Sequence, residues 1–150
     1  MKNYRTLTVK IVNKTLTEKV KSLESTLYEL NRNMIHDDKT DGSLIGKAQY
    51  TLFEIKCIAA MIEDPDMNIF RCANAILADM QKAAYYDRKE MILAAESEKG
   101  YFIGAVNAAM HVLESTGIVG RRTIDKTETV YLVDSSHRCI VDDPEKSGTR

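Results

Sequence analysis

The sequence predicts a mostly helical α+β fold, built as a single domain over residues 1–150. Three observations support this. Apolar residues recur at helical spacing through most of the chain, a short N-terminal stretch alternates polar and apolar residues, and two β-branched-rich runs follow Gly117. With 44% hydrophobic and 29% charged residues, the composition is that of a globular protein with a core. We expect a strand and a long amphipathic helix in 1–36, a helical core with a β-hairpin in 43–135, and a flexible tail in 142–150.

The first 36 residues predict a strand followed by a helix. "YRTLTVKIV", from Tyr4 to Val12, alternates polar and apolar residues with the period of a half-buried strand. Thr15 and Glu18 then match a capping box, which predicts that a helix begins there. The polar stretch "HDDKTDGS", in which Gly42 is a helix breaker, should end it.

Within this first helix, six apolar residues follow the alternating spacing of four and three that defines a heptad repeat. They are Leu16, Val20, Leu23, Leu27, Leu30 and Met34. One interpretation is a dimerisation coiled coil that pairs two copies of the chain into a homodimer. The other is the inner stripe of a helix that packs on its own domain.

The charge is unevenly distributed, although the formal net charge is only −1. The first 35 residues carry seven Lys and Arg against three Asp and Glu. Such a basic region either contacts phosphate or an acidic partner, or forms a solvated face that keeps the protein soluble. The lysines concerned are Lys10, Lys14, Lys19 and Lys21.

Four further helices follow from the spacing of apolar residues. Ser43 is placed to cap the first of them. Asp64 and Pro65 suit the N-cap and the first helical position of the next, where a missing N–H costs nothing. The expected bounds are 43–62, 65–86, 87–96 and 102–116.

A β-hairpin is predicted after the last helix. Gly117 follows the final helical turn, where a left-handed C-cap is favoured. "IVGRRT" and "ETVYLVD" are both strand-like, and "IDKT" between them is short and polar enough to close the turn. "HRCIVD", residues 137–142, is a candidate for a further strand.

The stretch "AAMHVLESTGIVGRRTIDKTETVYLVD", residues 108–134, resembles the recognition helix and wing of the winged helix-turn-helix superfamily. In that pattern a Leu-Glu pair, a Gly, two apolar residues and an Arg precede the turn, and an aromatic–apolar strand returns from it. The resemblance covers about residues 66–135. The pattern is shared by a very large superfamily, so it indicates an architecture rather than a particular protein.

The resemblance implies a role in binding double-stranded DNA. The helix 102–116 would lie in the major groove, where Asn107 and His111 would read base edges. Arg121, Arg122 and Lys126 would hold the DNA backbone from the wing or reach into the minor groove. The leading hypothesis is therefore a small cytoplasmic transcriptional regulator that binds DNA as a homodimer.

The alternative is a non-enzymatic protein-binding adaptor or inhibitor that docks on a larger complex. Its contact surface would be the heptad residues of the first helix or the edge of the β-hairpin. Residues 82–138 carry eight Lys and Arg against eight Asp and Glu, a balance that suits a protein partner as well as DNA. A third, weaker possibility is an accessory subunit of an enzyme, without chemistry of its own.

No pattern in the sequence points to catalysis, a metal or a cofactor. There is no glycine-rich phosphate loop and no nucleophile motif, so we expect no enzyme activity and no cofactor. His137 and Cys139 form the one close pair of potential metal ligands, whereas zinc sites usually show two such pairs. Cys57 and Cys72 are expected to be small core residues.

The chain is expected to be cytoplasmic, with no contact to a membrane. Its longest uninterrupted apolar run, residues 58–62, is far too short to span a bilayer. The N-terminus lacks the continuous apolar segment of a signal peptide. Three cysteines, an odd number without a Cys-x-x-Cys pair, favour a reducing compartment.

Overall fold

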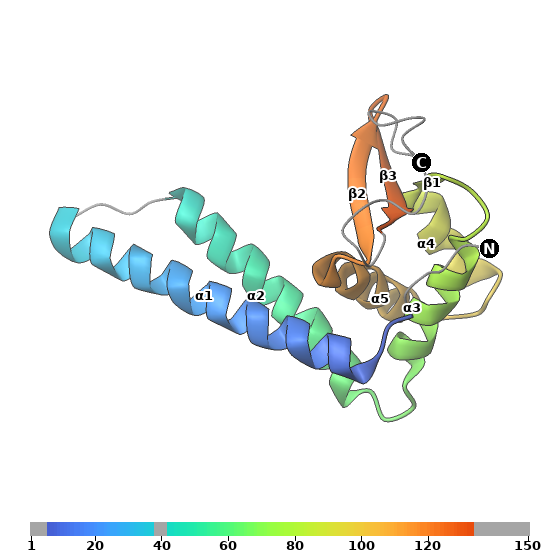
Figure 1. Ribbon diagram of the computed structural model, residues 1–150, viewed down its shortest axis with the longest axis horizontal. Coiled ribbons are helices and arrows are strands. Elements are labelled where there is room, and N and C mark those ends of the chain that lie inside the picture. The colour runs from blue at the N-terminus through green and yellow to red at the C-terminus, as the bar shows by residue number, and fades with distance from the viewer. Residues whose placement is uncertain (1–5, 38–41, 134–150) are drawn as a thin grey trace.

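The computed structural model describes residues 6–37 and 42–133, and in these ranges the chain is mostly helical with one small antiparallel sheet. Figure 1 shows two long helices that run side by side and project from a compact body formed by the other elements. The elements are α1 (Val9–Asp37), α2 (Gly42–Glu63), α3 (Asn68–Asp79), β1 (Tyr86–Asp87), α4 (Arg88–Ser97), α5 (Ile103–Thr116), β2 (Val119–Ile124) and β3 (Thr127–Leu132).

The predicted N-terminal strand is wrong, because α1 already begins at Val9. Leu7 is buried, and its N–H donates to Oδ1 of Asn74 on α3 at 2.9 Å while the Asn74 amide donates back to its carbonyl at 3.2 Å. The hydroxyl of Thr8 then accepts the N–H of Ile11 at 3.2 Å, which is an N-cap contact. These contacts set the start of the helix.

The predicted capping box is also wrong, because Thr15 lies inside α1 and is buried. The helix continues to Asp37, close to the predicted end, and α2 begins at Gly42, one residue before the predicted cap. The two helices run antiparallel and pack along much of their length (Figure 1). Lys19 of α1 pairs with Glu54 of α2 at 3.0 Å, which fixes their register.

Helix α3 is shorter than the prediction at both ends. It begins at Asn68, so Pro65 lies outside it and the N-cap position is Met67, not the predicted Asp64, although the Asp64 carboxylate does accept the N–H of Ile69 at 2.8 Å. It ends at Asp79 instead of near Tyr86, whose hydroxyl accepts the N–H groups of residues 82 and 83 and donates to the Asp79 carbonyl at 2.9 Å. The Tyr86 side chain thus stabilises a turn where a helix was predicted.

The sheet has the strand order β1-β3-β2, and both pairings are antiparallel. The short strand β1 was not predicted. The β2–β3 hairpin is confirmed, with Asp125 and Lys126 as its two central turn residues at φ values of 49° and 66°. Positive φ at both positions is the mark of a type I′ turn, whose twist matches that of the strands. Gly117 is the predicted left-handed C-cap of α5, with φ 81°.

The core lies where α3, α5 and the sheet meet, with α2 and the start of α1 closing one side. Its largest fully buried side chains include Leu7, Ile58, Ile76, Leu77, Met80, Met110, Leu113, Ile118 and Val130. Across residues 6–37 and 42–133, none of the helices combines the length and the apolar character that crossing a bilayer requires. The candidate strand 137–142 and the tail 142–150 lie outside the described residues.

Candidate nucleic-acid interface

Helix α5 lies at the centre of the body and leaves only part of its surface uncovered. Its inward residues are fully buried against α3 and α4. Its N-terminal half carries exposed residues: Asn107, Ile103 (42% exposed) and, just before the helix, Phe102 (84% exposed). No side chain caps this N-terminus, so its first N–H groups are not satisfied by a cap.

The C-terminal half of α5 is covered by α2. The ring of His111 meets the ring of Phe53 edge-on, with centroids 4.7 Å apart. Four residues on, the hydroxyl of Ser115 donates to Oε2 of Glu54 at 2.8 Å. Glu54 is itself buried and paired with Lys19, so a connected set of contacts joins α1, α2 and α5.

His111, predicted to read bases, is a half-buried residue of this junction. Burial lowers the pKa of its imidazole, and the nearby cations Arg88 and Arg121 lower it further, against the opposing effect of Glu114. A lowered pKa keeps the ring neutral at neutral pH. The ring packs edge-on against Phe53, its Nδ1 lies 3.7 Å from Oε1 of Glu114, and the side chain is only 19% exposed.

Glu114 is a largely buried acceptor, with its side chain 10% exposed, that sequence reasoning did not single out as a site residue. Arg88 of α4 binds it with two nitrogens, Nε to Oε2 at 2.8 Å and Nη2 to Oε1 at 3.2 Å. Arg121 of β2 approaches the same carboxylate at 3.8 Å. Such bidentate pairs are strong and directional. In the sequence, Glu114 was visible only as part of the Leu-Glu pair near the end of the helix. Its partners Arg88 and Arg121 become apparent only in the fold.

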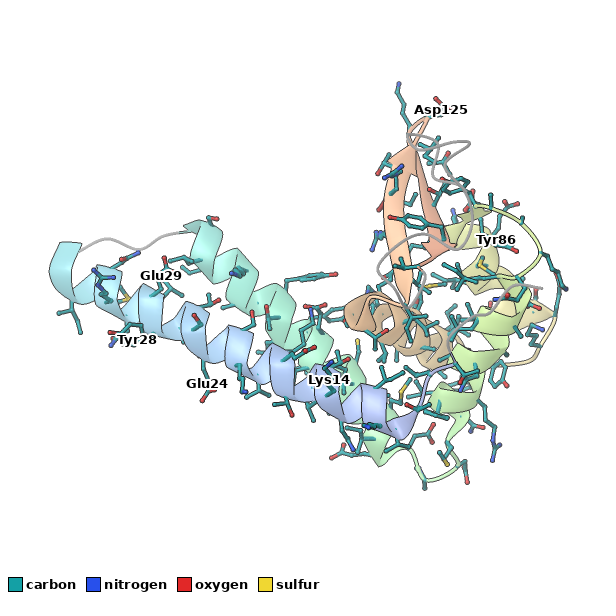
Figure 2. All side chains as sticks on the ribbon, in the orientation of Figure 1. Lys14, Glu24, Tyr28, Glu29, Tyr86 and Asp125 are labelled. Atoms are coloured by element: carbon teal, nitrogen blue, oxygen red, sulfur yellow. The ribbon has the colours of Figure 1, made fainter. Side chains whose placement is uncertain are left out.

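The three cations predicted for the β2–β3 hairpin have different surroundings. Arg121 binds Glu128 across the strands, and this contact lowers the pKa of the Glu128 carboxyl and raises that of the guanidinium. The Arg122 guanidinium lies 5.8 Å from the ring centroid of Tyr131, within cation–π range. Lys126 is exposed in the turn, beside Asp125 at the outermost point of the hairpin in Figure 2.

A groove of about 750 Å³ runs beside the uncapped start of α5. It lies between the C-terminal end of α2, the start of α3 and the turn that joins α4 to α5. Lys99 lines it and bridges to Asp79 at 3.1 Å. The groove is open and mixed in character, which suits contact with a macromolecule better than enclosure of a small ligand.

The described residues hold no group of three or more His, Cys, Asp and Glu side chains able to bind a metal ion. Cys57 and Cys72 are free and buried. Burial raises the pKa of both thiols, that of Cys72 to about 11, so neither is a reactive thiolate at neutral pH. His137 and Cys139 lie outside the described residues.

The chain was also compared with known proteins. No protein-family model matches it, and no curated protein or solved structure that was searched matches it either.

Proposed function

We propose that this chain is a DNA-binding regulator of the winged-helix type. It would contact double-stranded DNA through the N-terminal half of α5 and the tip of the β2–β3 hairpin. One observation carries the proposal. Ile103 and Asn107 are exposed in the N-terminal half of α5, which is the part of a recognition helix that contacts base edges.

The order of elements supports the same function. A helix, a short strand, two helices and a β-hairpin, with strand order β1-β3-β2, is the order expected of a winged helix. In this arrangement the helix and the hairpin can reach the same duplex, because β2 follows α5 after a short connection.

The proposed roles differ from residue to residue. Asn107 would form paired hydrogen bonds with adenine, and Ile103 would contact a thymine methyl group. Lys126 would contact phosphate from the turn. His111 and Arg121 would position the interface instead of touching DNA, because His111 packs against Phe53 and Arg121 binds Glu128.

The direct test is titration of the full chain with a mixed-sequence duplex, followed by fluorescence anisotropy. Arg122 and Lys126 offer about two phosphate contacts per protomer, so affinity should fall about 12-fold between about 50 mM and about 200 mM salt. At the lower salt concentration, Lys126→Glu should abolish most of the binding to the duplex. Lys14→Glu makes the same charge change on α1, far from the turn in Figure 2, and should leave binding unchanged.

The absence of binding at low salt would contradict the proposal. Equal losses for the two lysine variants would contradict it as well, since a general charge effect would then explain the binding. Asn107→Ala adds a test of base contact: it should reduce binding to some duplex sequences more than to others.

A second candidate function, a protein-binding adaptor, is favoured by a specific observation. Leu93 of α4, together with Phe102 and Ile103, leaves apolar side chains exposed around the turn that joins α4 to α5. An adaptor should lose a partner captured from its host on Phe102→Asp and keep it on Lys126→Glu. A DNA-binding regulator should lose its ligand on Lys126→Glu.

A further inference from the structure

The distal half of the α1–α2 hairpin projects from the body and has almost no core of its own. Figure 1 shows it free of the other elements. Among the residues of this part that the structure describes, the buried side chains are Thr26, Ala48 and Thr51, which are small or polar. Helices of this length gain most of their stability from packing, not from intrinsic propensity. Two helices that bury only such small or polar side chains between them gain little from this packing.

A line of exposed apolar residues runs along α1. Its members are Val9, Val20, Leu27 and Met34, which are between 39% and 57% exposed. They are separated by 11, 7 and 7 residues, each close to a whole number of helical turns, so they share one face. On α2, Leu52 is 43% exposed, and Ile45, seven residues earlier, is half-buried.

These two lines lie on the same face of the hairpin. Leu27 directly follows the buried Thr26 on α1, and Leu52 directly follows the buried Thr51 on α2. In a right-handed helix, one step along the chain turns the side chain by about 100°. Because α1 and α2 run in opposite directions and face each other, this step turns both lines to the same side. The opposite side of α2 packs on α5, as the contact from Glu54 to Ser115 shows.

The heptad residues of α1 are thus divided between two directions. Leu16, Leu23 and Leu30 are half-buried against α2, whereas Val20, Leu27 and Met34 face outward. A helix that packs on a single neighbour needs only one of these two sets of apolar residues. A helix in a four-helix bundle contacts two neighbours and uses both.

We propose that this outer face, made of Val20, Leu27, Met34, Ile45 and Leu52, binds the same face of a second copy. The two hairpins then form a four-helix bundle. From Val20 to Met34 the face is about 21 Å long, and two helices side by side make it about 20 Å wide, so it covers roughly 400 Å² in projection, about half of the ~800 Å² per partner in a standard interface. A second copy presents an equally apolar face of the same length, so the contact is self-complementary.

The test is the mass of the full chain in solution, measured by light scattering after size exclusion. We expect twice the chain mass of 16.9 kDa. Leu27→Lys should give a monomer. Tyr28→Lys makes the same charge change at the next residue, which is 71% exposed and turned away from the face, and it should remain a dimer. Figure 2 shows Tyr28 on the distal part of α1, away from the other elements.

A monomeric wild type at roughly 100 µM would overturn the pairing, because this concentration is well above the Kd of a stable dimer. A Leu27→Lys variant that remains dimeric would overturn it as well, and so would equal effects of the two lysine variants. Circular dichroism and the unfolding midpoint separate loss of pairing from loss of folding, since the body of a true monomeric variant stays folded. The pairing does not depend on DNA. A dimer that does not bind DNA would contradict the proposed function and leave the pairing intact. A monomer that binds DNA would contradict the pairing and leave the proposed function intact.

Discussion

The body and the distal hairpin are both built from helices with regular apolar spacing, yet they bury very different side chains. In the body, Ile76, Leu77, Met110 and Leu113 are at most 1% exposed. Among the described residues of the distal hairpin, those that are buried are two threonines and an alanine, and the larger apolar side chains are half-buried or exposed. The same sequence periodicity therefore produces a self-sufficient core in one region and an incomplete one in the other.

The largest expected effect of a substitution is in the body. Leu113→Ala removes a fully buried side chain and should lower the free energy of unfolding by about 2–5 kcal/mol. Leu30→Ala removes the same atoms from a half-buried position in the hairpin and should cost about 1 kcal/mol or less. Urea denaturation followed by circular dichroism measures both. Equal losses would show that the hairpin has a core comparable to that of the body.

A smaller effect is expected where the two regions meet. Glu54→Ala removes the acceptor of both Lys19 and Ser115 and should cost about 1–3 kcal/mol. Glu54→Gln keeps an acceptor for the Ser115 hydroxyl but loses the ion pair, so its cost should lie between that of the alanine variant and zero. Amide hydrogen exchange should be faster in the Glu54→Ala variant than in wild type for the residues of α2 around Glu54. Unchanged exchange there would mean that Glu54 does not couple the regions.

Glycine substitutions should have opposite signs in the two regions. Gly117→Ala places a side chain at φ 81° in the C-cap of α5 and should cost about 1–2 kcal/mol, with no steric clash contributing. Gly46→Ala lies inside α2 with open space around it and should stabilise the helix by up to about 1 kcal/mol. Thermal unfolding of the two variants checks these signs. A stabilised Gly117→Ala variant would contradict the left-handed cap.

The smallest effect is a pH dependence from His111. Because its folded-state pKa is lowered from 6.5, chiefly by burial and by Arg88, the unfolded chain binds more protons as the pH approaches 6.5 from above. His111 should therefore stabilise the fold above pH 6.5 and lose this contribution as the pH falls toward its folded-state pKa. Denaturation of wild type and His111→Gln across this range should give a shallower slope for the variant. Identical slopes would exclude this role.

Local chemistry explains which parts of the fold could be predicted. Gly117 and the "IDKT" turn carry their own conformational preferences, so the end of α5 and the β-hairpin follow from a few adjacent residues. The start of α1 does not follow from adjacent residues, because it depends on the hydrogen bond between Leu7 and Asn74, which are 67 residues apart in the sequence. Strand β1 exists only by pairing with β3, and its two residues carry no pattern of their own.

The candidate site could be predicted only in part, for a similar reason. Asn107 and Lys126 are exposed, as their positions suggested. His111 was also placed on the outer side of its helix, but the periodicity of α5 holds no information about α2, which covers that side. The heptad repeat of α1 was visible in the sequence, whereas its division between α2 and solvent depends on the packing of both helices.

At Lys126, backbone conformation lowers local stability, whereas the side chain supplies a positive charge at the surface. At φ 66° this residue occupies a backbone region that glycine adopts freely and lysine does not, at a cost of about 1–2 kcal/mol. A selection for thermal robustness alone would therefore favour glycine at this position. The protein would then give up the ammonium group at the outermost point of its β-hairpin, so a more robust variant obtained in this way would have a different surface there.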